Sequence, residues 1–140
     1  MDVLSKTDRS AVMRKVKSHG TKSELALMRL LESMKLRFRA QPEDIPGKPD
    51  FILPRLKLLI FMDGCFWHGC PACCRMPADH REYWVNKITR NGERDRRTTH
   101  QLRRAGWSVL RIWEHELKAP DDLKKRIHIA CATRRRRLAR

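Results

Sequence analysis

Residues 58–74 read LLIFMDGCFWHGCPACC, and the rest of the chain is organised around them. The apolar start, residues 58–61, predicts a buried β-strand, and Gly64 predicts the sharp turn that follows it. Between and after these come a carboxylate, Asp63, and an imidazole, His68. These two groups suit a hard divalent cation and an activated water. We therefore expect a reactive site where this strand ends.

Two adjacent aromatic side chains, Phe66 and Trp67, follow the same turn. Aromatic rings on an accessible surface are typical of sites that stack on nucleic-acid bases, and packing in the hydrophobic core is the alternative. The neighbouring glycine turn and polar residues favour the interpretation as a stacking surface.

Four of the five cysteines in the chain lie in this stretch: Cys65, Cys70, Cys73 and Cys74. In a reducing compartment such crowding favours metal binding over disulfides, with a redox motif or plain buried thiols as the alternative. Cys70 and Cys73 form a C-x-x-C pair, with Cys74 as an alternative to Cys73 and Cys65 as a spare thiol. A structural Zn²⁺ needs four ligands, so two more must come from elsewhere, and Asp95 and His115 are candidates among the many acids and histidines of the chain.

The charge of the chain indicates its partner. Its 140 residues suffice for one domain, residues 1–140, and carry 32 Lys and Arg against 16 Asp and Glu, a formal net charge of +16. Such an excess attracts a polyanion, and nucleic acid is the expected one. No apolar run approaches the ~20 residues of a membrane span, and residues 1–10 lack the apolar core of a signal peptide. We expect a cytoplasmic protein with no membrane partner.

The two ends of the chain are basic. Residues 1–20 predict an arm with a marginal helix, and an equally good interpretation is a solvated, partly disordered terminus. Residues 133–140 predict a disordered tail that adds sequence-independent affinity for phosphate.

The TKSE sequence of residues 21–24 has the form of a capping box and predicts a helix through about Met34. Glu24 then has two interpretations. As part of the cap it satisfies backbone donors, and as a site residue it reaches a metal ion or a metal-bound water. The residues by themselves favour the cap, because the motif is common.

A second carboxylate, Asp50, comes just before another short β run. Residues 51–53 and 57–62 flank a Pro-Arg turn and predict an antiparallel hairpin, which brings Asp50 beside Asp63. Two like charges raise one pKa unless a cation neutralises them, so Mg²⁺ is the expected third member. For either aspartate taken singly, a turn role is the alternative.

The remaining elements follow from periodicity and turn residues. Residues 36–40 predict an edge strand, and residues 107–113, WSVLRIW, predict a strand by alternation. Asp79 is expected to cap a long basic helix that reaches residue 104, with a kink at Gly92. A last helix is expected from about residue 120 to Cys131.

The order of motifs resembles the very short patch repair endonucleases of bacteria over about residues 9–116. The strings that carry the resemblance are PGKPDF, FMDGCFWHGC, YWVNKI, ERDRR and GWSVLRIWE. The resemblance implies an α/β fold with a restriction-endonuclease-like core of the PD-(D/E)xK type, a mixed central sheet flanked by helices, and a structural zinc. It also implies a Mg²⁺-dependent DNA mismatch endonuclease. Such an enzyme nicks one strand of double-stranded DNA 5′ to the T of a T:G mismatch left by deamination of 5-methylcytosine.

The same resemblance assigns roles to residues of the predicted site. Asp50 would be the principal Mg²⁺ ligand, the backbone carbonyl of Met62 would complete the coordination, and His68 would be the general base. Glu24 would hold metal-bound waters, with Asp63 as an additional acidic residue of the site. The implied zinc ligands are Cys70, Cys73, Asp95 and His115.

The implied DNA contacts are aromatic. Phe66, Trp67 and Trp84 would wedge beside the mismatch from the major groove, and Met13 would enter from the minor-groove side. A monomer suffices for nicking one strand, and other mismatch-repair proteins are expected partners.

Two departures from the family pattern keep other functions open. Met62-Asp63 stands where the family has Thr-His, and Cys65 stands where restriction-type nucleases carry the lysine of D-x-K. The extra carboxylate favours a restriction-like DNA endonuclease without mismatch specificity. The charge and the cysteines taken without the rest fit a non-enzymatic zinc-stabilised DNA-binding module.

Overall fold

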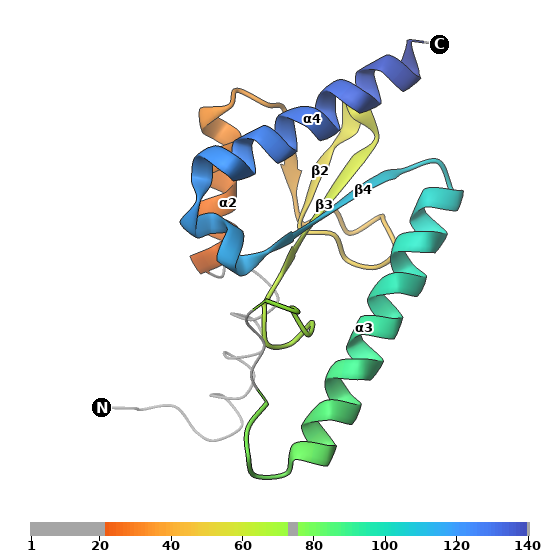
Figure 1. Ribbon diagram of the computed structural model, residues 1–140. Helices are drawn as coiled ribbons and strands as arrows, with labels where there is room; N and C mark the ends of the chain where they lie inside the picture. Colours follow the sequence, from red (N-terminus) through yellow and green to blue (C-terminus); the bar gives the residue numbers. More distant parts are fainter. Residues whose placement is uncertain (1–21, 73–75, 140) are drawn as a thin grey trace, which may run out of the picture.

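The computed structural model describes residues 22–72 and 76–139, which form a mixed sheet covered by helices on both faces (Figure 1). In chain order the helices and strands are α2 (Lys22–Ser33), β1 (Arg39–Ala40), β2 (Phe51–Leu53), β3 (Leu58–Asp63), α3 (Arg81–Arg104), β4 (Ser108–Trp113) and α4 (Pro120–Leu138). The basic N-terminal arm with Met13, and also Cys73 and Cys74, lie outside the described residues. Among the described helices, none combines the length and the apolarity that a membrane span requires.

The sheet has the order β1-β2-β3-β4, with β3 at its centre. β2 and β3 form the predicted antiparallel hairpin, in which Phe51 pairs with Ile60, and β4 lies parallel to β3. The expected edge strand is present as β1, shortened to two residues. The observed fold is therefore the predicted mixed α/β arrangement.

The alternation of β3 explains why helices cover both faces. Leu58 and Ile60 join a core cluster with α2 and α4, whereas Leu59 and Phe61 join a second cluster on the side of α3. A strand with apolar residues at every position is stable only when both of its faces are buried. The apolar run of β3 thus places the polar residues that follow it at the rim of the sheet.

Three local predictions were wrong. The C-terminal tail was expected to be disordered, but α4 continues to Leu138. Arg134 stabilises this last part, because its guanidinium donates to the backbone oxygens of Leu56 (2.7 Å) and Gly106 (2.6 Å). The long helix α3 begins at Arg81 without a side-chain cap from Asp79, and it runs as one helix through Gly92.

Candidate active site

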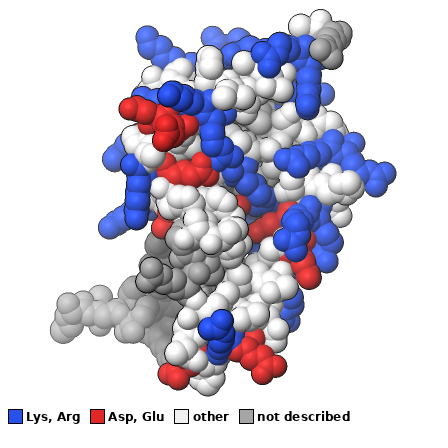
Figure 2. All heavy atoms as spheres, viewed as in Figure 1, with Lys and Arg blue, Asp and Glu red and all other residues white. Residues whose placement is uncertain are grey.

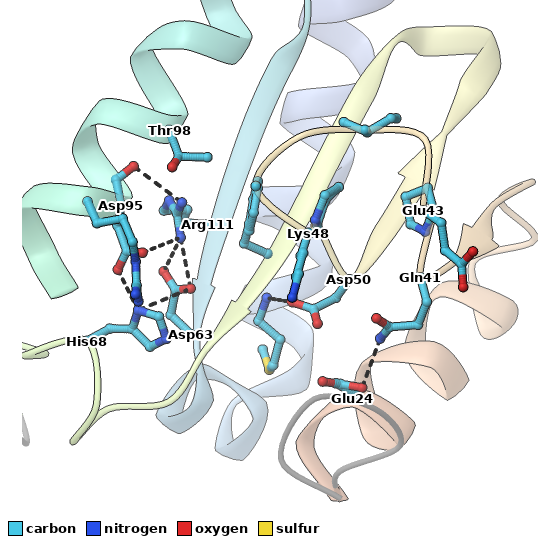
Figure 3. A pocket seen from close by; sticks show the side chains of 17 residues that line it. Glu24, Gln41, Glu43, Lys48, Asp50, Asp63, His68, Asp95, Thr98 and Arg111 are labelled. Carbon is cyan, nitrogen blue, oxygen red and sulfur yellow. Dashed lines mark hydrogen bonds and ion pairs between the residues drawn. The ribbon is translucent and has the colours of Figure 1, made fainter. Parts of the chain in front are cut away.

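A cavity of about 820 Å³ opens at the end of β3, between α3 and the loop that precedes β2 (Figure 3). Its polar lining includes the four predicted catalytic residues, Glu24, Asp50, Asp63 and His68, and also Asp95, which was predicted as a zinc ligand. Lys and Arg are spread over the surrounding surface, with Asp and Glu gathered in patches between them (Figure 2). The structure therefore gathers these acids and the imidazole in one place on a strongly basic molecule.

Asp50 lies at the cavity because the hairpin ladder ends there. Its backbone amide donates to the oxygen of Ile60 (3.0 Å), and its own carboxylate Oδ2 accepts the next amide along β3, that of Met62 (2.7 Å). The side chain of Asp50 thus accepts a hydrogen bond from β3 where the backbone hydrogen bonds between β2 and β3 end. This contact fixes the carboxylate beside the backbone of Met62.

The surroundings of Asp50 raise its pKa to about 7. Burial is the main cause, since desolvation disfavours the charged carboxylate, and the hydrogen bond from the Met62 amide offsets only part of it. The neighbouring Glu24 carboxyl raises the pKa further, by its charge and by a hydrogen bond. We call this pair, Glu24 and Asp50, the Asp50 side of the cavity.

Glu24 belongs to the site and is buried near the start of α2. The Gln41 side chain donates from Nε2 to its Oε2 (3.1 Å), and both residues line the cavity. The residues by themselves favoured a helix-cap role for Glu24, which does not predict that its side chain lines the cavity.

His68 is held by a turn of residues 64–70, which directly follows β3. Within the turn, the His68 amide donates to the Gly64 oxygen (3.1 Å), and the Asn91 side chain of α3 donates to the Trp67 oxygen (2.9 Å). Gly69 has a φ of +69°, and a Cβ there would lie 2.7 Å from the Ile88 side chain. The turn therefore packs so closely against α3 that the imidazole has a defined position.

Two carboxylates flank the His68 ring. Its Nδ1 lies 2.5 Å from Asp95 Oδ2 and 3.8 Å from Asp63 Oδ1. Burial works against the charged imidazole, but the hydrogen bond to Asp95 and the two negative charges outweigh it and raise the pKa of His68. Burial by itself would raise the pKa of Asp95, but the hydrogen bond and the charge of His68 outweigh it and lower the pKa of that carboxyl.

Asp63 is paired with an arginine. Arg111 of β4 donates from Nη1 to both carboxylate oxygens of Asp63 (3.0 and 3.1 Å), from Nε to the Thr99 hydroxyl (2.8 Å) and from Nη2 to the Asp95 backbone oxygen (3.3 Å). Burial nevertheless raises the pKa of Asp63, since His68 and Arg111 offset the desolvation only in part. We call this group, Asp63, His68, Asp95 and Arg111, the Asp63 side of the cavity.

The two aspartates that the hairpin brings together have different surroundings, and the Mg²⁺ expected between them stays a prediction. Both aspartates line one cavity, but Asp63 has Arg111 as its counter-ion, whereas Asp50 has a backbone amide and Glu24. Arg111 was missed by the sequence analysis. A signal was present, because the alternation of WSVLRIW places this arginine on the same face as the buried Val109, where a charge needs a partner.

A second cluster of metal-ligand types lies beyond the turn. The side chains of Cys65, Cys70 and His115 offer ligand atoms that all lie within 4.8 Å of one another. His115 Nδ1 is 3.4 Å from Cys65 Sγ and 3.5 Å from Cys70 Sγ. Two such ligands on one tetrahedral zinc lie about 3.6 Å apart, so the donor set fits this metal.

The predicted zinc set is corrected in two places. Asp95 falls in a different group of metal-ligand types, with Asp63 and His68, and its Oδ2 lies 2.5 Å from His68 Nδ1. Cys65, considered only a spare thiol, lies in the cluster instead. The prediction for Cys73 concerns a residue outside the described part of the chain.

The three predicted aromatic residues contact one another. Phe66 lies 5.2 Å from Trp67 and 5.5 Å from Trp84 between ring centroids, in edge-to-face geometry. None of the three belongs to the two hydrophobic core clusters, and Trp67 is 38% exposed. The rings therefore form an aromatic cluster outside the two core clusters, in which Trp67 is accessible and Phe66 and Trp84 are half-buried.

Comparisons with known proteins identify the family of the chain. The family model of the DNA mismatch endonuclease Vsr matches residues 1–74. The DNA mismatch endonuclease Vsr of Escherichia coli K12 is 40% identical over 123 residues, covering 87% of this chain and 79% of that protein. The Type II nicking enzyme V.XorIIP of Xanthomonas oryzae is 39% identical over 129 residues, covering 90% and 93%. V.NaeI of Lentzea aerocolonigenes, also a Type II nicking enzyme, is 42% identical over 113 residues, covering 77% and 68%.

Among solved structures, the catalytic domain of the homing endonuclease I-Bth0305I has a similar fold. The TM-score is 0.58 at 23% sequence identity, covering 82% of this chain and 98% of that domain. Since a family model covers more than half of the chain and close relatives span most of it, the chain belongs to the Vsr family and is a DNA endonuclease.

Proposed function

We propose that the chain is a Mg²⁺-dependent endonuclease that nicks one strand of a DNA duplex 5′ to the T of a T:G mismatch. The observation that carries the proposal is that Asp50 and His68 line one cavity, next to the aromatic cluster. A metal-binding carboxylate, a general base and a stacking surface are the three parts that mismatch nicking requires.

The Asp50 side suits the metal. Within a strand the N–H and C=O of one residue project toward the same neighbouring strand, so the Met62 carbonyl projects toward Asp50 as its amide does. Carboxylate and carbonyl oxygens are ligands that Mg²⁺ prefers, and Glu24 is close enough to receive metal-bound waters. Bound there, Mg²⁺ would stabilise the charge on the phosphate and on the leaving 3′ oxygen.

His68 suits the base. Its Nδ1 faces Asp95, which leaves Nε2 as the nitrogen that can take a proton from water. Asp95 holds the ring and stabilises the imidazolium that forms when the water is deprotonated. His68 therefore activates the water, while Asp50 would hold the Mg²⁺ that stabilises the charge on the phosphate.

The aromatic cluster suits recognition of the mismatch. Inserting Phe66 or Trp67 into a duplex costs a few kcal/mol of base stacking, and the cost is lower where a wobble pair stacks poorly. Trp84 supports both rings from α3. The cluster thus favours a mismatch before any base edge is read.

The Cys65, Cys70 and His115 cluster is the proposed structural zinc site. Closing the turn between β3 and α3 on a zinc ion would fix His68 and the aromatic rings together. His115→Ala is expected to reduce the zinc content of the purified protein to near zero by elemental analysis, whereas His100→Ala, on the exposed surface of α3, keeps one equivalent. Equal zinc in both variants would remove this site from the proposal.

The test of the function uses labelled duplexes that differ in a single pair. With Mg²⁺, the protein is expected to nick the T:G duplex 5′ to the T, to leave the T:A duplex intact, and to lose activity in Asp50→Ala. Equal cleavage of the two duplexes would leave an endonuclease without mismatch specificity.

That second candidate has an observation in its favour. The Asp63–Arg111 pair stands where the family pattern has an imidazole, so this chain shapes its site differently beside His68. The T:G and T:A duplexes separate the two candidates, since the second predicts strand cutting at a matched sequence.

A further inference from the structure

The loop of residues 46–49, Pro-Gly-Lys-Pro, lies against α3 at the rim of the cavity. Gly47 has a φ of +86°, and a Cβ on it would lie 2.2 Å from the Thr98 methyl carbon, so the loop backbone touches the helix. Lys48 follows with a φ of +53°, which is rare for a residue with a side chain. Prolines on both sides restrict this conformation further. The loop therefore presents Lys48 from a defined position.

A second cation reaches the cavity from the opposite wall. Arg94 lies four residues before Thr98 on α3, and residues at this spacing share one face of a helix. Lys48, Arg94 and Thr98 all line the cavity that contains Asp50. Lys48 and Asp50 are seen together in this pocket in Figure 3. Two basic side chains thus flank the cavity, one from the loop and one from the helix.

These two cations differ from the third one in the cavity. Arg111 is engaged by Asp63, Thr99 and the Asp95 backbone. Within residues 22–72 and 76–139, by contrast, neither Lys48 nor Arg94 has an acidic side chain within 4.0 Å. Their charges remain available to an anion that enters the cavity.

We propose that Lys48 and Arg94 form a phosphate-binding subsite, which holds the backbone phosphodiester of the strand to be cut beside Asp50 and His68. The proposal rests on the DNA-nicking function proposed above and deepens it. A lysine binds phosphate as a point charge, and an arginine adds paired donors, so the two together position a phosphodiester from both sides.

The test neutralises the protein charge and the phosphate charge separately. Binding of Lys48→Met and Arg94→Met is measured by fluorescence anisotropy on T:G duplexes, in buffer without divalent metal so that no cleavage occurs. One duplex carries normal phosphates, and three others carry a single uncharged methylphosphonate at the expected nick or one position to either side. Arg97→Met is the matched control, because Arg97 is an exposed arginine of α3 that does not line the cavity.

On the normal duplex each subsite variant is expected to bind about tenfold more weakly, with the slope of log K against log salt reduced by about 0.9, the value of one phosphate contact. On the duplex with the matching methylphosphonate, the variant and the unmodified protein are expected to bind alike. Lys48→Arg is expected to retain binding, and Arg97→Met to show no dependence on which of these phosphates is neutral.

The subsite is overturned if the effects of Lys48→Met and Arg94→Met are the same on all four duplexes, or if neither variant weakens binding more than Arg97→Met does. Circular dichroism checks that each variant is folded. Failure of the proposed function looks different: the unmodified protein would then fail to nick the T:G duplex with Mg²⁺, while the binding experiment still reports on the subsite.

Discussion

The two sides of the cavity compensate their acidic charge in different ways. On the Asp63 side, Arg111 and His68 lie against the buried carboxylate of Asp63 and the half-buried carboxylate of Asp95. On the Asp50 side, the nearest groups are a backbone amide and a second carboxyl, Glu24, so burial raises the pKa of Asp50 to about 7. The Asp63 side thus carries its own cations, whereas on the Asp50 side two carboxyls lie close together, which is why the proposed Mg²⁺ is assigned to the Asp50 side.

The largest expected effect comes from removing the charge of Asp50. Asp50→Asn keeps an oxygen for the Met62 amide but loses the anionic metal ligand, so the rate of nicking should fall by about 10³-fold. In Asp63→Asn the rate of nicking should fall by only about tenfold, and its dependence on Mg²⁺ concentration should stay the same. Single-turnover nicking of the T:G duplex across a Mg²⁺ titration measures both. Equal losses with equal shifts in Mg²⁺ dependence would mean that the two sides share one metal.

The next effect comes from removing the internal counter-ion. Arg111→Met leaves Asp63 buried without its arginine, and breaking a buried ion pair costs about 3 kcal/mol in the free energy of unfolding. Urea denaturation measures this loss. The double variant with Asp63→Asn should recover most of it, because no uncompensated charge remains. A double variant as unstable as Arg111→Met would show that packing against the Phe61 ring, 4.2 Å from the guanidinium carbon, is what matters.

A smaller effect concerns pH and the metal-free protein. Because the pKa of Asp50 is 3.8 when unfolded and about 7 when folded, the native state holds the extra proton, and the free energy of unfolding falls as pH rises from about 4 to 7. The raised pKa of His68 acts in the same direction above about pH 6.5, so a comparison with Asp50→Asn is needed to isolate Asp50.

At pH 8 without divalent metal, Asp50→Asn should be more stable than the unmodified protein by on the order of 2 kcal/mol. Thermal unfolding across this pH range measures the difference. Added Mg²⁺ should remove it by stabilising only the protein that has the aspartate. If the stability of the two proteins changed with pH in the same way, the idea that the Asp50 charge has no counter-ion in the metal-free protein would be contradicted.

The smallest expected effect comes from Arg134, which belongs to neither side of the cavity. Arg134→Met loses two hydrogen bonds to backbone oxygens and should lower the free energy of unfolding by about 1 kcal/mol without changing the rate of nicking. Thermal unfolding and the nicking assay measure the two quantities. Arg136→Met, on the exposed side of α4, is the control and should change neither. A slower nicking rate in Arg134→Met would connect α4 to the cavity.

The elements were predictable where a short local pattern decides them. The apolar run of β3, the Pro-Arg turn before it and the alternation of WSVLRIW are such patterns, and each strand formed where they indicate. The prediction of a disordered tail was wrong, because a run of four arginines is typical of solvated surface. In the structure Arg134 is anchored across 78 residues to Leu56. No local pattern contains that contact.

The sequence by itself determined the family, the sheet and the acids and imidazole at the rim of the sheet, because β-strand periodicity and the motif strings are local properties of the chain. Only the tertiary structure decided which groups pair. The parallel packing of β4 on β3 brings Arg111 to Asp63, and the close contact of the Gly69 turn with α3 brings His68 to Asp95 instead of leaving Asp95 to the cysteines. Pairing depends on distances between segments far apart in the chain, and packing alone sets these distances.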